Sequence, residues 1–522
     1  MKKTSWEDTR KIFLHWLSNN QLKKKFSNNL CYNNLSLWWL TNLYEKDNIN
    51  ETQWYEDLNK VFFSNKEIEK KKKFSFFLNY LKLTKKFFSS IFFNLFIKVF
   101  YSEKLPSKIN LKNCIYTLST NFIEHEGHFI DRQYGLYGLN NKKDVVYFID
   151  VFENFDLIRN YFSNKKKFSK IPFKYHLSEK NLRIRDIIKV YFFCLKKLIK
   201  IYFILKKKNY FIIKKKDCSK ILKDKVIKSF FGSIQEQLIK GISLNNLLNE
   251  KNFKNFINCF DFHPQSRCIF YFAKNSKVKN LININHANYS ENNTFFNFKK
   301  NEFSINNKDY KNFSPQPDIF FCQGKKYAKK LKKIFDDKKI FTIGSLKIEL
   351  NKSKLNTKKK FNNKKKKKVI VILCSLNDYQ SFIKVLNRCD LKKFRIIIAP
   401  HPLKKEKTIQ EFKIKFKNNF LTDRNLNKTK LLNSCDYIIF GDTSLGLELS
   451  IMKKNIFRIY EKEFVPTFDI DKEVPTATNS KEVMNFLNKK KVTQNSKLIE
   501  QNYFYKYDKK ASKRFSNILK NF

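Results

Sequence analysis

Two polar loops in the C-terminal third of the chain have residue types that bind phosphate. The segment Gly441-Asp442-Thr443-Ser444 follows the apolar run at 437–440, and the turn Pro400-His401-Pro402 follows the apolar run at 395–399. A hydroxyl-bearing loop at the start of a helix offers free backbone N–H groups and the positive end of the helix dipole. An imidazole can hydrogen-bond a phosphate or protonate it as it leaves. These loops are therefore the first candidates for a phosphate site.

Each loop also has a purely structural interpretation. Thr443 or Ser444 would simply cap the following helix, as such residues often do, and a lone histidine such as His401 is more often structural. Two such loops at strand ends of one predicted domain favour phosphate binding, because the carboxyl ends of parallel strands meet at one edge of the sheet. Further candidates for the same site also follow apolar runs: Ser375, Gly344 and Ser345.

A loop in the N-terminal half could supply a catalytic carboxylate. Residues 122–138 read FIEHEGHFIDRQYGLYG and contain three of the nine glycines in the chain. Such clustering in a glycine-poor chain indicates backbone geometry that other residues do not tolerate. Glu126 is the first candidate for a base that removes a proton from a hydroxyl group, and Asp131 is the second. The alternative for each carboxylate is a solvated turn residue.

Two more side chains lie at or near predicted strand ends and could line a cleft. His286 ends the segment ININH, and Arg267 ends the segment DFHPQSR. Each is a weak signal by itself. No P-loop, GxGxxG, HExxH or GxSxG pattern occurs, which excludes the usual ATPases, dinucleotide enzymes, zinc proteases and serine hydrolases. No DxD stands at a suitable strand end, so we expect no obligatory metal.

Short β-branched runs alternate with helical patterns in two tandem blocks. The first block has runs at 114–119, 145–151, 282–285, 318–322 and 340–343, and the second has runs at 369–374, 395–399, 437–440 and 456–460. This alternation is typical of a parallel sheet with helices on both faces. We therefore predict an α/β protein with two Rossmann-like domains that face each other across a cleft.

Shifts in pattern give the domain boundaries. Residues 1–105 have apolar spacings of three and four and are predicted to be helical. The first Rossmann-like domain covers 106–350, a Lys-rich linker 351–368, the second domain 369–484 and a helical tail 485–522. An insertion at 187–216 combines aromatic residues and lysines in a helical pattern. It is either a helix packed on the core with lysines on its wet side, or a helix lying on a membrane surface.

Lysine dominates the charge of the chain. The 522 residues include 107 Lys and Arg against 47 Asp and Glu, a formal net charge of +60. Asn, Phe, Ile and Tyr are also in excess, so we interpret most of the charge as the imprint of AT-rich codons. Arg, which nucleic-acid-binding proteins use for bidentate contacts, is rare, and no specific nucleic acid partner is expected. An anionic membrane surface would still attract the lysines.

The cysteines and the N-terminus indicate a cytoplasmic protein. The ten cysteines are scattered without a CxxC pair, so neither a zinc site nor a disulfide framework is expected. The opening residues, MKKTSWEDTRKIFLHW, lack the apolar segment of a secretory signal. The uncharged apolar stretch at 87–97 is about half of the roughly 20 residues that span a bilayer. We therefore expect no transmembrane helix.

Several of these segments together resemble a known family. In chain order they are EGHFIDRQYGLYG, a strand ending in NHA, PQPDIFFCQG with GSLK, RIIIAPHP, and CDYIIFGDTSLGLELSIMKKNIF. The set is similar to the GT-B fold glycosyltransferases of bacterial surface-polysaccharide biosynthesis, above all to O-antigen-type surface carbohydrate biosynthesis proteins. It is more distantly similar to polysialyltransferases and CDP-glycerol glycerophosphotransferases. The resemblance covers residues 114–465.

The resemblance implies a metal-independent glycosyltransferase of O-antigen, lipopolysaccharide or capsule biosynthesis. By the family pattern, His401, Pro402, Thr443 and Ser444 would bind the phosphates of a nucleotide-activated sugar, with a cytidine nucleotide weakly favoured. Glu126-Gly127 is the nearest match to the acidic-Gly motif that supplies the base, with Asp131 as a rival. No cofactor is implied besides this donor substrate. The acceptor would be a lipid-linked or growing glycan, which puts the enzyme peripherally at the inner membrane.

Two other functions stay open at this stage. A sugar-nucleotide epimerase of the same shape would share the phosphate loop but need no acceptor. A non-enzymatic basic scaffold for membrane or nucleic acid would owe its affinity to charge alone and lose it with salt.

The chain also departs from the family pattern at one place: it has Asn285-His286-Ala287 where many relatives have Gln-His-Gly.

Overall fold

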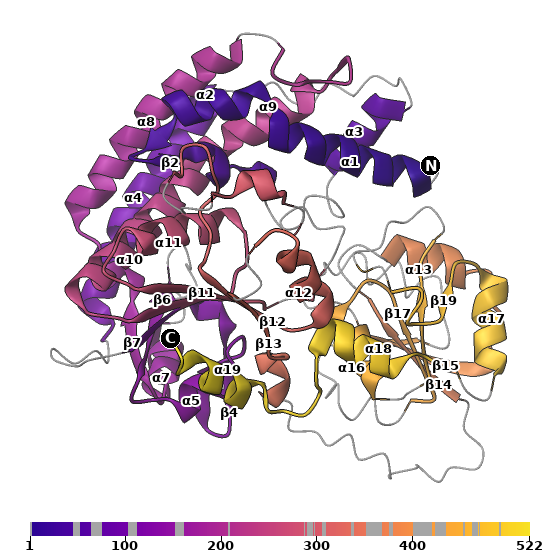
Figure 1. Cartoon of the computed structure of the whole chain (residues 1–522). Helices are drawn as coiled ribbons and strands as arrows, with labels where there is room; N and C mark the ends of the chain where they lie inside the picture. Colours follow the sequence, from indigo (N-terminus) through magenta and orange to yellow (C-terminus); the bar gives the residue numbers. More distant parts are fainter. Residues whose placement is uncertain are drawn as a thin grey trace.

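The structure is a computed structural model. It describes residues 3–44, 53–63, 76–102, 112–151, 161–206, 209–286, 288–289, 296, 298–304, 309–335, 339–350, 368–374, 379–399, 420–422, 435–452, 455–461, 468, 470–489 and 492–522. Two parallel sheets with helices around them form most of the described chain (Figure 1). The linker expected at 351–368 lies outside the described residues except for Lys368, which begins a strand.

The N-terminal sheet has seven parallel strands in the order β13-β12-β11-β10-β3-β6-β7. The strands are β3 (Asn113–Leu118), β6 (Val145–Asp150), β7 (Lys174–Leu177), β10 (Asn255–Asn258), β11 (Asn280–Ile284), β12 (Ile319–Cys322) and β13 (Ile340–Thr342). Counted along the chain, the spatial order runs 3-2-1-4-5-6-7 from the β7 edge. The order therefore reverses between β3 and β10, which is the topological switch point of a doubly wound sheet.

The C-terminal sheet repeats this topology with six parallel strands, in the order β16-β15-β14-β17-β18-β19. They are β14 (Lys368–Leu373), β15 (Phe394–Ala399), β16 (Phe420–Thr422), β17 (Tyr437–Phe440), β18 (Ile456–Ile459) and β19 (Thr476–Ala477). Counted along the chain, this is the Rossmann order 3-2-1-4-5-6, with its switch point between β14 and β17. The predicted α/β architecture of two Rossmann-like units with an added helical region is confirmed.

Helices cover both sheets, and their bounds follow chain order. They are α5 (Tyr137–Asn140), α7 (Tyr161–Ser169), α9 (Ser219–Lys228), α10 (Ile234–Glu250), α11 (Pro264–Lys274), α12 (Lys325–Lys332), α13 (Tyr379–Leu386), α16 (Ser444–Ile451) and α17 (Ser480–Asn488). A short hairpin, β4 (Phe122–His125) with β5 (His128–Asp131), follows β3. No disulfide joins any of the ten cysteines, all of which the structure describes.

The N-terminal region is largely helical, as predicted. It contains α1 (Lys3–Asn19), α2 (Gln21–Asn29), α3 (Gln53–Phe63) and α4 (Phe76–Phe100). Residues 31–36 instead form a small hairpin, β1 (Cys31–Tyr32) with β2 (Leu35–Ser36), and two 3-10 turns, η1 (Leu37–Leu40) and η2 (Asn42–Tyr44), follow. These elements share one core with α8 to α11. The helical region thus packs on α8 to α11, and α10 and α11 in turn pack on the N-terminal sheet.

The insertion predicted as one helix over 187–216 is shorter in the structure. Helix α8 (Ile184–Lys206) ends before a hairpin of β8 (Ile212–Ile213) and β9 (Lys216–Asp217). Lys214 and Lys215 have positive φ values of 47° and 65° in the hairpin turn, which a regular right-handed α-helix does not allow. One face of α8 is buried in the helical core, including Val190 and Leu198, so the core-packed interpretation is confirmed for that face.

The C-terminal tail contacts both sheets. Helix α18 (Ser496–Ile499) and the turn η10 (Glu500–Phe504) pack on the C-terminal sheet through Ile499 and Phe504. Helix α19 (Ala511–Leu519) returns to the N-terminal sheet, where the Phe515 ring lies 4.7 Å from that of Phe321. The tail predicted as a separate helical segment therefore belongs to both units. Among the described helices, none is both long and apolar enough to cross a bilayer.

Candidate functional site

The switch point of the N-terminal sheet gathers two buried carboxylates. Asp131 ends β5 beside the carboxyl end of β3, and Asp261 follows β10. Both interact electrostatically with the thiol of Cys259, which lies directly after β10. Ligands of doubly wound sheets bind in the crevice at this point. The N-terminal unit therefore has titratable groups where its topology favours a ligand.

Asp131 is enclosed by hydrogen-bond donors. Its carboxylate accepts from the Thr117 hydroxyl and, at 2.7 Å, from the backbone N–H of Gln133. Burial raises the pKa of Asp131 to about 7, although these donors oppose the shift. A carboxylate with a pKa near neutrality can accept a proton at physiological pH, which an ordinary aspartate does poorly.

Asp261 and His286 form a pair at the ends of neighbouring strands. His286 follows β11, and its Nδ1 lies 3.3 Å from Oδ2 of Asp261. Asp261 is buried with φ of 44° and also accepts from Asn283 at 3.0 Å and from Asn285 at 3.2 Å. The His286 side chain is 11% exposed. A buried carboxylate facing one ring nitrogen fixes the orientation of an imidazole.

Sequence reasoning missed Asp261 as a site residue. The available signal was positional, because Asp261 follows the run NFIN at 255–258 much as His286 follows NLINI at 280–284. The strand β10 was not predicted, since its two Asn residues interrupt the apolar pattern. The segment DFHPQSR was placed near a strand end, but Arg267 and not Asp261 was taken from it as the candidate, because no strand was predicted directly before Asp261.

An aromatic ring lies between His286 and a second polar group. The half-buried Phe260 ring is 5.6 Å from the His286 ring and 5.9 Å from the Tyr116 ring. Tyr116 donates to Asp150 Oδ2 at 2.6 Å, and Gln265 Nε2 reaches the same oxygen at 3.1 Å. This edge of the sheet thus presents an aromatic surface flanked by hydrogen-bonding side chains.

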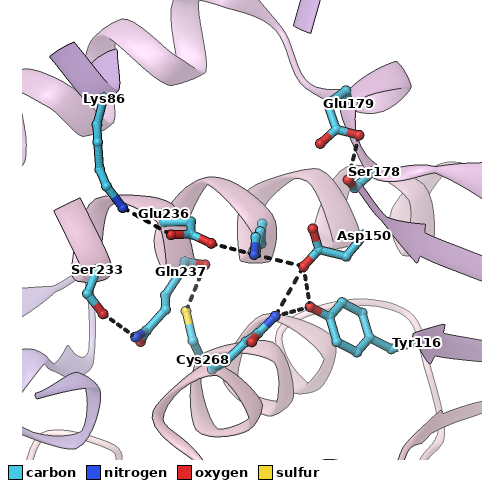
Figure 2. Close-up of polar contacts among 11 residues, drawn as sticks. Lys86, Tyr116, Asp150, Ser178, Glu179, Ser233, Glu236, Gln237 and Cys268 are labelled. Carbon is cyan, nitrogen blue, oxygen red and sulfur yellow. Dashed lines mark hydrogen bonds and ion pairs between the residues drawn. The ribbon is translucent and has the colours of Figure 1, made fainter. Parts of the chain in front are cut away.

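A buried ion network anchors this edge to the helical layer (Figure 2). Lys240 of α10 lies 3.0 Å from Asp150, at the end of β6, and 2.6 Å from Glu236. Glu236 also pairs with Lys86 of α4 at 3.3 Å. Burial alone would lower the pKa of Lys240, but Asp150 and Glu236 raise it well above its usual value. The network therefore holds an ionised lysine inside the protein.

Glu179 lies next to this network, in the turn after β7. It is buried and accepts from the Ser178 hydroxyl at 2.7 Å. Burial raises the pKa of Glu179 to about 8, with a further contribution from the charge of Asp150. At neutral pH this carboxyl is therefore mostly protonated, which limits the negative charge around Lys240 to Asp150 and Glu236.

The structure separates Glu126 from these groups. Glu126 is exposed at the turn of the β4–β5 hairpin, with φ of 49°. The neighbouring Gly127 and His128 line a cavity of about 660 Å³ with Lys142 and Lys143, which precede β6, and with residues 169–174, which lead into β7. The hairpin tip therefore lies toward the amino ends of these strands, away from Asp131 and His286.

Arg267 does not line an open cleft, contrary to expectation. Its side chain is 1% exposed, and its guanidinium carbon lies 4.2 Å from the Tyr44 ring centroid and 5.3 Å from that of Trp39. Its Nε donates to the carbonyl of Phe262 at 2.9 Å. The planar cation stacks against aromatic faces inside the helical core, where it links α11 to the turns η1 and η2.

The polar loop at the C-terminal switch point has one capping residue and one exposed hydroxyl. Gly441 follows β17, and the Thr443 hydroxyl accepts from the Leu445 backbone N–H at 3.3 Å, so the capping interpretation is confirmed for Thr443. Ser444, the first residue of α16, is exposed. Its hydroxyl is therefore accessible to a ligand at the start of this helix. Ser375, His401 and Pro402 lie outside the described residues.

A buried ion pair holds this loop against the neighbouring strand β18. Asp442 lies 2.8 Å from the guanidinium of Arg458 in β18, and Arg458 is fully buried. Arg458 also donates to the carbonyl of Phe468 at 2.6 Å and lies 3.6 Å from Asp471. The Asp442 carboxylate is thus paired with Arg458 and does not face a ligand. The Ser444 hydroxyl and the loop backbone remain for that contact.

Gly344 and Ser345 lie in the N-terminal unit, directly after β13. Gly344 has φ of 91°, and a Cβ there would lie 2.9 Å from Nη2 of Arg514 in the tail. Ser345 is buried. Two residues further on, Lys347 interacts electrostatically with Glu448 of α16, and burial raises the pKa of Glu448. This segment therefore lies where the two units approach each other, and packing against the tail accounts for Gly344.

No protein-family model matches the chain, and no curated protein matches it in sequence. Among solved structures, the chain is similar to UDP-GlcNAc 2-epimerase from Neisseria meningitidis bound to UDP-GlcNAc. The identity is 10% and the TM-score 0.43, over 79% of this chain and 100% of that one. It is also similar to the wall teichoic acid polymerase TagF with CDPG, at 10% identity and a TM-score of 0.40, over 86% of this chain and 98% of that one.

Within the described residues, no three His, Cys, Asp or Glu side chains form a group that could hold a metal ion.

Proposed function

We propose that the protein is a GT-B-type glycosyltransferase that moves a sugar from a nucleotide-activated donor to a lipid-linked or growing surface glycan. The observation that carries this proposal is that each of two Rossmann-order sheets has its own polar group set at its switch point. One set offers proton acceptors, and the other offers the exposed Ser444 hydroxyl at the start of a helix. A reaction between two bound substrates requires two such sites. O-antigen or capsule-type biosynthesis is the pathway class that this chemistry serves.

The C-terminal unit takes the donor in this proposal. The start of α16, with the Ser444 hydroxyl, would bind the donor phosphates, while the Arg458–Asp442 pair keeps the loop in place. His401 and Pro402 would complete the site after β15. Stabilisation of the negative charge on the departing nucleotide is expected to contribute most of the rate acceleration in such a reaction. We assign this task to the helix start and His401, without a metal or cofactor, and we favour a cytidine nucleotide.

The N-terminal unit takes the acceptor. In this proposal, His286 Nε2 removes the proton of the acceptor hydroxyl while its Nδ1 faces Asp261. The acceptor oxygen forms the new bond to the anomeric carbon, and the bond from that carbon to the donor phosphate breaks. Asp131, with its pKa of about 7, is the second candidate for this proton. The Phe260 ring would pack against the C–H face of an acceptor sugar.

A lipid-linked acceptor implies that the enzyme works at the cytoplasmic face of the inner membrane. The acceptor's lipid would stay in the bilayer while its sugar reaches the edge of the N-terminal sheet. The large positive net charge is compatible with an anionic membrane surface. We assign no specific nucleic acid partner.

Titration calorimetry with CMP, CDP, UDP, GDP and ADP tests the donor site. We expect one of these nucleotides to bind, and to bind at least about tenfold more weakly to Ser444→Asp, because a carboxylate there repels the phosphates. Asp is favoured in the first turn of a helix, so this variant should remain folded. Ser444→Asn, which is neutral and of similar size, is the matched control and should retain most of the affinity. Equal binding to Ser444→Asp and the wild type would contradict a phosphate site at this loop.

A further inference from the structure

Two long helices pack side by side in the helical region of the N-terminal unit. Helices α4 and α8 meet through Phe87 and Tyr191, whose rings stack at 4.4 Å, and the Thr84 hydroxyl lies 3.2 Å from the Tyr191 hydroxyl. Their inner sides join the helical core. Figure 1 shows the pair at the left edge, with the C-terminal sheet at the right. The outer sides of both helices therefore face away from the second unit.

These outer sides carry large apolar side chains in contact with water. Phe88 and Phe92 of α4 are 62% and 55% exposed, and Phe192 and Phe203 of α8 are 60% and 59% exposed. Other exposed apolar residues continue the stripe on each helix: Leu81, Leu95, Val99, Ile188 and Ile199. The spacings of three, four and seven place each set on one side of its helix. A single exposed apolar residue is ordinary, but a stripe of them on each of two packed helices indicates an interaction surface.

The charge of the same helices is almost entirely positive. Helices α4 and α8 contain ten Lys or Arg residues and one acidic residue, Asp186. Exposed cations lie among the exposed rings: Lys82, Lys85, Arg185, Lys189, Lys196 and Lys200. A codon bias raises both lysine and phenylalanine anywhere in the chain, but it does not explain why the exposed large apolar residues gather mostly on these two helices. Aromatic side chains flanked by lysines complement the acyl boundary and phosphate headgroups of an anionic bilayer.

We propose that the exposed side of α4 and α8 is a docking face for an anionic phospholipid bilayer. The helices lie parallel to the membrane plane, with the rings in the headgroup region and the lysines on lipid phosphates. The proposal rests on the proposed function in one respect, namely that the acceptor is lipid-linked. Docking on this face puts the N-terminal sheet, with His286, closer to the bilayer than the C-terminal sheet.

Flotation of the full-length protein with phospholipid vesicles tests this face. We expect binding to vesicles of phosphatidylcholine with 30% phosphatidylglycerol and much weaker binding to phosphatidylcholine alone. The triple variant Phe92→Ser/Phe192→Ser/Phe203→Ser should bind the anionic vesicles at least about tenfold more weakly, because three apolar rings no longer leave water. Phe63→Ser is the matched control, since Phe63 is also exposed but lies on α3. It should bind like the wild type.

A second variant and two further measurements make every outcome informative. Lys196→Glu/Lys200→Glu keeps all the rings and should also lose binding to anionic vesicles, so the test survives if the triple variant misfolds. Wild-type protein that does not float, or triple and charge variants that float like the wild type, would overturn the proposal. A third result would also overturn it: the wild type forms a dimer in analytical ultracentrifugation and binds no vesicles, and the triple variant is a monomer. A second copy of the chain would then cover the face. The nucleotide titration separates the two proposals. Vesicle binding without nucleotide binding would support the docking face and contradict the proposed donor site.

Discussion

Replacement of His286 by alanine is expected to reduce the rate of sugar transfer by a factor of roughly 100 to 10,000, the range typical for loss of a general base. The imidazole lies at the carboxyl end of β11 with Nδ1 facing the buried Asp261. Removing the ring leaves the acceptor hydroxyl without this proton acceptor, while the buried Asp261 keeps its hydrogen bonds from Asn283 and Asn285. Steady-state kinetics with saturating donor should show the loss in kcat.

Asp261→Asn tests the other member of the pair, which would position the His286 ring without itself accepting the proton. We expect a smaller loss of kcat than in His286→Ala, since the amide keeps the shape of the pair but no longer presents a carboxylate to Nδ1 of His286. His128→Ala is the control, because His128 is exposed at the hairpin tip beside the separate cavity, and its activity should match the wild type. An unchanged kcat in His286→Ala would remove His286 from the mechanism and leave Asp131 as the candidate base.

Replacement of Lys240 by methionine is expected to destabilise the N-terminal unit by about 3–5 kcal/mol, the usual cost of breaking a buried ion pair by removing one partner. Methionine fills similar space but leaves Asp150 and Glu236 without the lysine that lies 3.0 Å and 2.6 Å from them. Asp150 would then be a buried negative charge without this cation, while Glu236 would keep Lys86, at 3.3 Å. Urea denaturation at pH 7, followed by circular dichroism, should show the unfolding transition at a lower urea concentration.

Lys228→Met is the matched control for this effect. Lys228 is exposed and lies 3.8 Å from Asp224 on the surface of α9, and such pairs contribute about 0–1 kcal/mol. The two variants differ in whether the ion pair that is broken is buried. The difference between their free energies of unfolding therefore measures the contribution of burying the network. Equal stability of the two variants would mean that the network at the end of β6 adds nothing to the fold.

The fold was predictable where strands are apolar on both faces. The run VIVIL in β14 and the run RIIIA in β15 contain consecutive β-branched residues, as strands buried in a parallel sheet do. Strand β10 escaped prediction because Asn255 and Asn258 occupy buried positions. Asn255 is tolerated there because it donates to Asn113 of β3 at 2.9 Å and accepts from Asn280 of β11 at 2.8 Å. Cross-strand amide pairing of this kind is invisible in a one-dimensional pattern.

The site was predictable only in part. The glycine cluster correctly indicated unusual backbone geometry, since Gly127 and Gly135 have φ values of 78° and 58°. It did not indicate which carboxylate lies at the sheet edge, because that depends on how the β4–β5 hairpin folds back over the sheet. Arg267 was misplaced for a similar reason, as its two nearest aromatic partners, Trp39 and Tyr44, are more than 200 positions away in the sequence. The role of Asp261 depended on a strand that the sequence did not reveal.

Acceptor-dependent consumption of a sugar nucleotide tests the central claim most directly. We would incubate the purified protein with CMP-, CDP-, UDP- and GDP-activated sugars, with and without washed bacterial membranes as the source of lipid-linked acceptors. Phosphorus NMR then follows the donor, and heat-inactivated protein serves as the blank. The proposed transferase should release free nucleotide from one donor only when membranes are present, and leave that donor unchanged without them. Conversion of a donor into a different sugar nucleotide in the absence of membranes would identify an epimerase instead, and no change in any donor would contradict a sugar-nucleotide enzyme.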